Sequence, residues 1–132
     1  MLPGLVHIMD QPELQKNEGP IMVILAPTRE LAAQIYTETK KFARGFGLRI
    51  GAIYGGMSKF EQFKVLKAGV EAVVATPGRL IDLIKMKGTN LARCTYVVLD
   101  EADRMLNMGF ESQVRSIVGQ VRPLAPCYLL LS

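Results

Sequence analysis

The sequence lacks tryptophan and has only one histidine and two cysteines, Cys94 and Cys127, among its 132 residues. Two cysteines cannot build a disulfide framework or a four-cysteine zinc site, so we expect an intracellular protein. Its apolar runs are far shorter than the ~18–20 residues that a membrane span needs. The first nine residues also lack the basic segment and cleavage site of a signal peptide. These absences argue against secreted disulfide-rich proteins and membrane proteins.

The composition is that of one globular domain, with 49% hydrophobic and 21% charged residues and a net charge of +4. The charge is uneven, because residues 29–99 hold twelve basic and five acidic side chains, a balance of +7. Such an excess suits a polyanion such as nucleic acid. Scattered lysines and arginines also simply solvate helix faces, and charge alone favours this second interpretation.

Short apolar runs alternate along the chain with longer amphipathic runs, which is typical of parallel α/β proteins. Strands are expected at residues 21–26, 49–54, 71–75, 96–99 and 127–131, and helices at 29–43, 58–68, 79–86 and 110–121. The strands are almost wholly apolar, as they are when helices cover both faces of a sheet. The sequence therefore predicts a doubly wound α/β fold, with ligands bound at the carboxyl ends of the strands.

Three of the predicted strand ends carry groups that bind phosphate. The first strand is followed by Pro27-Thr28-Arg29, the second by Gly55-Gly56 and the third by Thr76-Pro77-Gly78-Arg79. Small residues leave backbone N–H groups exposed at the helix starts, and the hydroxyl and guanidinium groups add further donors. We expect phosphate contacts at all three places.

The fourth strand ends in carboxylates, Asp100-Glu101-Ala102-Asp103. An aspartate at a strand end can hold hydrated Mg²⁺ on nucleotide phosphates while a neighbouring glutamate activates the attacking water. Alternatively, Asp100 or Asp103 only caps the following helix. For an isolated Asp-Glu pair the capping interpretation is the better one.

The four segments occur in one order: Pro-Thr-Arg-Glu-Leu-Ala at 27–32, Gly-Gly at 55–56, Thr-Pro-Gly-Arg-Leu at 76–80 and Asp-Glu-Ala-Asp at 100–103. Together they resemble the N-terminal RecA-like domain of the DEAD-box ATP-dependent RNA helicases. The resemblance extends over nearly the whole chain. It implies a RecA-like (P-loop NTPase-type) parallel sheet with helices on both faces, incomplete at both ends.

The resemblance also implies roles for individual residues, with ATP and Mg²⁺ as cofactors. Asp100 would coordinate Mg²⁺ through water, Glu101 would activate the hydrolytic water, and Asp103 would couple the ATP site to strand separation. Ser132 resembles the first residue of the family's Ser-Ala-Thr motif, which together with Asp103 links the two helicase domains. The residues that would grip the RNA backbone, with little sequence specificity, are Pro27, Thr28, Arg29, Gly55, Gly56, Thr76, Pro77, Gly78 and Arg79.

Other parts of the family pattern are missing. No glycine is followed by lysine, so the Gly-x-x-x-x-Gly-Lys-Thr phosphate loop (Walker A) cannot be placed, and there is no second RecA-like domain. We therefore expect residues 1–132 to be a partial domain without appreciable ATPase or unwinding activity alone. The absent loop strand is expected to lie beside the Asp-Glu strand, so its loss would leave unpaired strand edges that favour non-native self-association.

Three interpretations stay open. In the first, the chain is part of an ATP-dependent RNA helicase that unwinds duplexes or remodels RNA–protein complexes, with RNA and a second RecA-like domain as partners. In the second, it is a catalytically inactive, truncated module that binds RNA or protein. A nucleotide-binding domain of another class is the third, although no Gly-x-Gly-x-x-Gly occurs. The sequence from Asp103 to Ile117 resembles spliceosome-associated members, which favours the nucleus, with the cytoplasm as the alternative.

Overall fold

The computed structural model describes residues 8–9, 18–121 and, for the backbone alone, 128–131. Its elements in chain order are β1 (Met22–Leu25), α2 (Arg29–Phe46), β2 (Ile50–Ile53), α3 (Lys59–Ala68), β3 (Ala72–Ala75), α4 (Pro77–Lys85), β4 (Tyr96–Leu99), α5 (Ala102–Asn107), α6 (Glu111–Val118) and β5 (Tyr128–Leu131). Cys127, expected to begin the last strand, lies outside the described residues. The same is true of Ser132, which resembles the first residue of the Ser-Ala-Thr motif.

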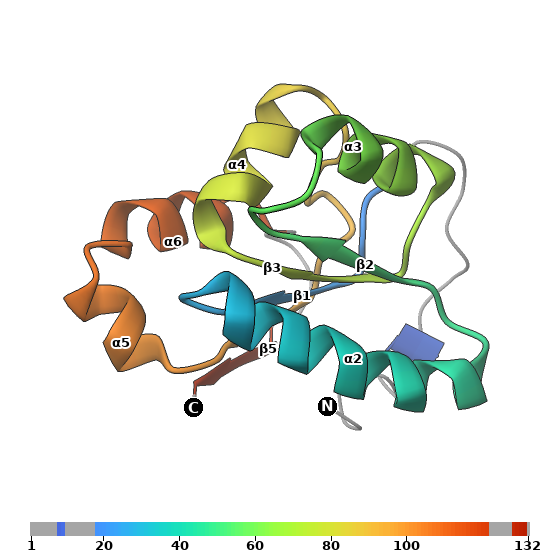
Figure 1. Ribbon diagram of the computed structural model, residues 1–132, viewed down its shortest axis with the longest axis horizontal. Coiled ribbons are helices and arrows are strands. Elements are labelled where there is room, and N and C mark those ends of the chain that lie inside the picture. The colour runs from blue at the N-terminus through green and yellow to red at the C-terminus, as the bar shows by residue number, and fades with distance from the viewer. Residues whose placement is uncertain (1–7, 10–17, 122–127, 132) are drawn as a thin grey trace.

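The strands form one parallel sheet in the order β2-β3-β1-β4-β5. Helix α2 covers one face of this sheet, while α3, α4 and α6 lie on the other (Figure 1). The predicted α/β fold with a parallel sheet between helices is therefore confirmed. Within the described residues, no helix has the length and apolar character needed to cross a membrane.

The core lies on both faces of β1, whose four residues are all buried. Val23 and Leu25 pack toward α3, α4 and α6, whereas Met22 and Ile24 pack toward α2. Alternate residues of a strand point to opposite faces, so a strand between two helix layers must be apolar at every position. This requirement explains the uninterrupted apolar runs in the sequence.

The helices α2, α3 and α4 each begin at a residue type that favours a helix start. Thr28 caps α2, with its Oγ1 accepting a hydrogen bond from the Leu31 N–H at 3.2 Å. Ser58 caps α3, where its Oγ accepts from the Glu61 N–H at 3.4 Å. Helix α4 begins at Pro77, two residues before the predicted start, since proline lacks an N–H and suits the first helical position.

One expectation from the sequence is wrong, and one helix was not expected. The Asp-Glu strand β4 has no unpaired edge, because β1 lies on one side and β5 on the other. The edges of the described sheet are instead β2 and β5, and one sequence alone does not reveal such a crossover order. The region after the acidic motif also contains the short helix α5 in addition to the predicted helix around α6.

We predict opposite effects of one substitution at two neighbouring glycines of α2. Gly45 lies in the last helical turn with no atom within 4 Å of a built Cβ, whereas Gly47 ends the helix at φ +68°. Gly45→Ala should raise the free energy of unfolding by about 0.5–1 kcal/mol, because alanine favours the helix. Gly47→Ala should lower it by about 1 kcal/mol, because an L-residue is strained there. Urea denaturation followed by circular dichroism measures both changes, and equal signs would contradict this account.

Candidate nucleic-acid interface

The candidate site lies where four strands end in one row. The pairing sets Leu25 beside both Ala75 and Leu99, and Ile53 beside Ala75. The segments that follow β1, β2, β3 and β4 therefore leave the sheet at the same edge. The structure thus brings the predicted phosphate-binding segments and the acidic segment to one end of the molecule.

Arg29 brings the first of these segments against the second. A Cβ built on Gly56, which has φ +87°, would lie 2.6 Å from Nη1 of Arg29. Any side chain at position 56 would therefore displace the guanidinium. The Arg29 side chain is 60% exposed, and its Nε donates to Glu30 Oε1 at 3.2 Å. The remaining guanidinium donors can face a ligand on the surface.

Arg79 joins the second segment to the third. Its Nη1 donates to the Met57 carbonyl at 2.9 Å and to Gln62 Oε1 at 3.2 Å, and its Nη2 lies near Gly55. Gln62 is buried, and its Nε2 donates to the Tyr54 carbonyl at 2.8 Å. These hydrogen bonds, here called the Arg79 network, hold the loop after β2 against the start of α4.

The third segment presents its donors at a helix start. Thr76 is the N-cap of α4, and its side chain makes no capping hydrogen bond. Its backbone N–H donates to the Ile53 carbonyl at 3.0 Å, which ties β3 to β2 at this edge. Pro77 is buried at the first helical position, and Gly78 follows without a side chain. The Thr76 hydroxyl is therefore left for a ligand, unlike that of Thr28.

The acidic segment continues directly from β4. The Asp100 N–H donates to the Leu25 carbonyl at 2.9 Å, which extends the pairing with β1 by one residue. Glu101 is the N-cap of α5 in a left-handed conformation, with φ +52° and no side-chain capping bond. Asp103 is exposed in the first turn of α5. The N-cap position of α5 is thus Glu101, rather than Asp100 or Asp103.

The donor set fits Mg²⁺ better than a metal held entirely by protein. Within the described residues, no group of three or more His, Cys, Asp or Glu side chains is placed to hold a metal ion. Magnesium commonly keeps several waters and uses one or two carboxylates together with substrate phosphates. Asp100 can supply such a carboxylate, whereas nothing in the sequence supplies a Gly-Lys loop for the phosphates of ATP.

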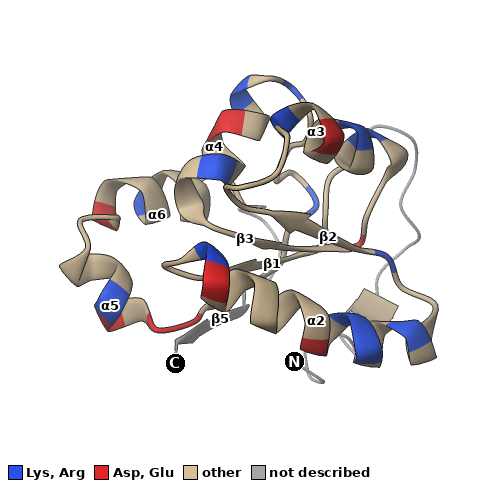
Figure 2. Ribbon diagram, in the orientation of Figure 1, with Lys and Arg blue, Asp and Glu red and all other residues tan. Residues whose placement is uncertain are grey.

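The electrostatics of this end are mixed. One basic residue lies near the start of each of α2 and α4, followed in α2 by the acidic Glu30, and the acidic segment between β4 and α5 lies at the same end of the molecule (Figure 2). The pKa of Glu30 is below its usual value because a backbone hydrogen bond and the Arg29 side chain favour the carboxylate, with a smaller contribution from Arg104.

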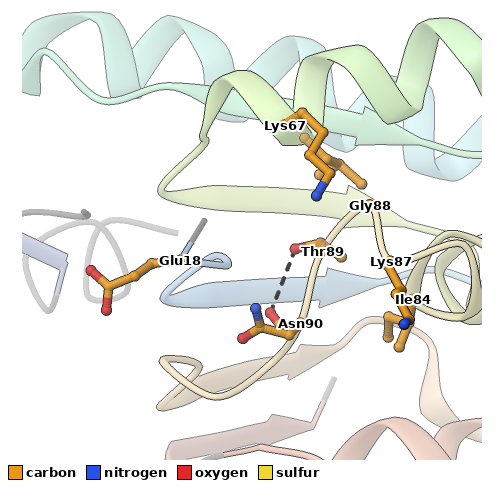
Figure 3. Close-up of a pocket in the computed structure, with 8 residues that line it drawn as sticks. Glu18, Lys67, Ile84, Lys87, Gly88, Thr89 and Asn90 are labelled. Carbon is orange, nitrogen blue, oxygen red and sulfur yellow. Dashed lines mark hydrogen bonds between the residues drawn. The ribbon is translucent and has the colours of Figure 1, made fainter. Parts of the chain in front are cut away.

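A cavity of about 310 Å³ lies away from this site (Figure 3). Its lining includes Glu18, Lys67, Gly88 and Asn90, from segments that precede strands or end helices. The cavity therefore belongs to the amino ends of the strands, opposite the row of motif residues. It contributes nothing to the candidate interface.

Gln62 is a site residue that the sequence analysis did not identify. A glutamine in a helix is usually exposed, so nothing in its type predicts burial. The available signal was its position four residues before the buried Leu66, on the same face of α3.

We predict that Gln62→Met lowers the free energy of unfolding by about 1–3 kcal/mol, because the Tyr54 carbonyl loses its donor and Arg79 loses an acceptor.

Urea denaturation measures this loss, with Gln120→Met as the matched control. Gln120 is exposed at the end of α6 and bonds only within its own turn. Its replacement should change stability by less than about 0.5 kcal/mol. Equal effects of the two substitutions would show that the Arg79 network does not stabilise the fold.

We also predict that Glu101→Gly stabilises the chain relative to Glu101→Ala. Glycine adopts the positive φ of position 101 without strain, whereas alanine retains a backbone strain energy of about 1–2 kcal/mol. Both variants lose the carboxylate and its 3.8 Å contact with Arg104, so their difference isolates the backbone. Thermal or urea unfolding of the two variants side by side gives this difference. A glycine variant no more stable than the alanine variant would refute the strained conformation.

Known proteins are similar to this chain in sequence and in fold. The chain is 70% identical over 123 residues to the DEAD-box ATP-dependent RNA helicase 24 of Arabidopsis thaliana, which covers 93% of the chain and 16% of that protein. It is 62% identical over 121 residues to the ATP-dependent RNA helicase DDX42 of Xenopus laevis, covering 92% of the chain and 13% of that protein. The chain thus spans less than a fifth of the length of these relatives.

The fold matches a crystal structure of the yeast DEAD-box splicing factor Prp28 with a TM-score of 0.89 and 34% identity. That match covers 98% of this chain and 31% of the Prp28 chain. The family model of the DEAD/DEAH box helicases matches residues 1–132. The ordered motifs, the sheet and these matches agree: the chain belongs to the DEAD/DEAH box helicase family.

Proposed function

We propose that this chain supplies the RNA-backbone grip and the acidic catalytic motif of an ATP-dependent RNA helicase. The observation that carries the proposal is the convergence of Arg29 and Arg79 on the Gly55-Gly56 turn. Residues separated by about 50 positions in the sequence meet there, with exposed backbone and guanidinium groups. Such groups contact phosphate and sugar rather than base edges, so binding has little sequence specificity.

One set of site residues would bind the RNA, and a second set would take part in ATP hydrolysis. Phosphate oxygens of the RNA would accept hydrogen bonds from Arg29, Arg79 and the Thr76 hydroxyl. The glycines would let the RNA strand approach the protein backbone closely. When bound, Mg²⁺ would offset the negative charge of the ATP phosphates. Asp100 would hold the waters around that ion, and Glu101 would orient the attacking water. Asp103 would connect this site to the second RecA-like domain, as proposed also for Ser132.

A binding module that acts without ATP is the second candidate. The observation in its favour is the lack of any Gly-Lys pair, because the family's phosphate loop requires one. A phosphate loop supplies much of the electrostatic stabilisation of phosphoryl transfer, and residues 1–132 contain none. For these 132 residues alone, we propose RNA binding that ATP leaves unchanged at a fixed concentration of Mg²⁺ and salt.

Fluorescence anisotropy with a labelled single-stranded RNA tests the proposal. We expect Arg29→Gln to weaken binding several-fold and to reduce the dependence of log Kd on log salt by about 0.7, the share of one phosphate contact on a single strand. The matched control is Arg44→Gln at the other end of α2. The helix has 18 residues and is therefore about 27 Å long. Equal losses in both variants would indicate only nonspecific attraction and contradict the proposed grip.

Two further measurements separate the catalytic proposal from RNA binding. Glu101→Gln should leave the RNA affinity of the chain unchanged, because the carboxylate is assigned to water rather than to RNA. At a fixed concentration of Mg²⁺ and salt, adding ATP to the titration should also leave the RNA affinity unchanged. RNA-stimulated phosphate release by the chain, abolished in Glu101→Gln, would contradict the expectation that the chain alone is inactive.

A further inference from the structure

A large aromatic side chain lies exposed just beyond the proposed RNA grip. Phe60, in the first turn of α3, is 61% exposed and belongs to neither core cluster. Met57, immediately after Gly55-Gly56, is also about half exposed. The inner face of α3 is provided by Gln62 and Leu66 instead. Packing within the described residues therefore does not account for a phenylalanine at position 60.

A cation accompanies the ring. The Nζ of Lys64, one helical turn further along α3, lies 4.6 Å from the centroid of the Phe60 ring. Among the described residues, Lys64 takes part in no ion pair, whereas the neighbouring Lys59 pairs with Asp82 at 3.2 Å. An exposed ring next to a cation with no acidic partner suits a ligand that has both a flat face and a negative charge. A nucleotide of a single strand has both.

The hydrogen bonds that place the RNA grip also place Phe60. The Ser58 cap fixes the start of α3, and the Arg79 network joins Met57 and Gln62 to α4 on either side of Phe60 in the sequence. The ring is therefore held on a rigid helix four residues after Gly56. A strand whose backbone lies on the Gly55-Gly56 turn would bring a neighbouring base to this helix.

We propose that Phe60 and Lys64 form a stacking platform for one base of single-stranded RNA, with Phe60 stacking on the base and Lys64 attracting the adjacent phosphate. The inference rests on the proposed RNA grip and extends it from the backbone to a base. Because every base has a flat face, the platform adds affinity without reading sequence. Continuity with the grip and the basic side chains favour RNA over a protein partner.

The test compares Phe60→Ala with Phe42→Ala in the anisotropy assay. Phe42 is the matched control, because it is 50% exposed on α2 and lies in the half of that helix remote from Arg29. One lost stacking contact should weaken binding of a single-stranded RNA about 5- to 150-fold. Phe42→Ala should leave the affinity unchanged, and Phe60→Trp should retain it. Circular dichroism and urea denaturation confirm that each variant is folded.

A second ligand separates stacking from other effects. On a ribose-phosphate strand of the same length without bases, Phe60→Ala should bind as tightly as the unchanged chain. An equal loss on both strands, or no loss on either, would overturn the platform. If RNA binding depends on Arg29 but not on Phe60, only the platform fails. If the unchanged chain does not bind RNA, the proposed grip fails and the platform with it.

Discussion

The register of the parallel sheet is the constraint on which the rest of the structure depends. Leu25, Ile53, Ala75 and Leu99 lie side by side at one edge, so the four segments after them leave the sheet together. A shift of one residue in a strand would exchange its two faces and move its motif out of line. The buried apolar side chains that set this register therefore also position the candidate site.

Side-chain hydrogen bonds then convert this row of strand ends into a surface of defined shape. Arg79 is held by the Met57 carbonyl and by Gln62, and Gln62 in turn holds the Tyr54 carbonyl. These bonds hold the residues on either side of the Gly55-Gly56 turn. Arg29 approaches the same turn from the other side but stays exposed. Arg79 thus positions the turn as well as facing the proposed RNA site, whereas Arg29 leaves most of its guanidinium donors to a ligand.

Much of the fold was predictable from local sequence patterns. The apolar runs located all five strands to within two residues, and Thr28 and Ser58 marked their helices as N-caps. The order of the strands was not predictable in the same way, because the placement of β5 beside β4 depends on packing between distant segments. Helix α5 has only six residues, too few for a helical period to stand out.

The site itself shows the same division. The motif residues were found from their types at the strand ends, and the structure places the described ones along a single edge. Gln62 was missed because its importance comes from burial and from Arg79, which lies 17 residues away in sequence. Phe60 likewise stands out only through its exposure beside a lysine. Residue type predicts chemistry, whereas partners and exposure emerge only after folding.

The two capping threonines differ in a way that connects binding with folding. The hydroxyl of Thr28 already satisfies a helix N–H, whereas that of Thr76 satisfies none. Helix α4 therefore begins without the stabilisation of about 1 kcal/mol that such a cap commonly provides. A phosphate at this helix start would accept from the same N–H groups and complete the cap from outside. Helix α4 would then be capped only while the ligand is bound. The first turn of α4 would be more ordered in the bound state than in the free state.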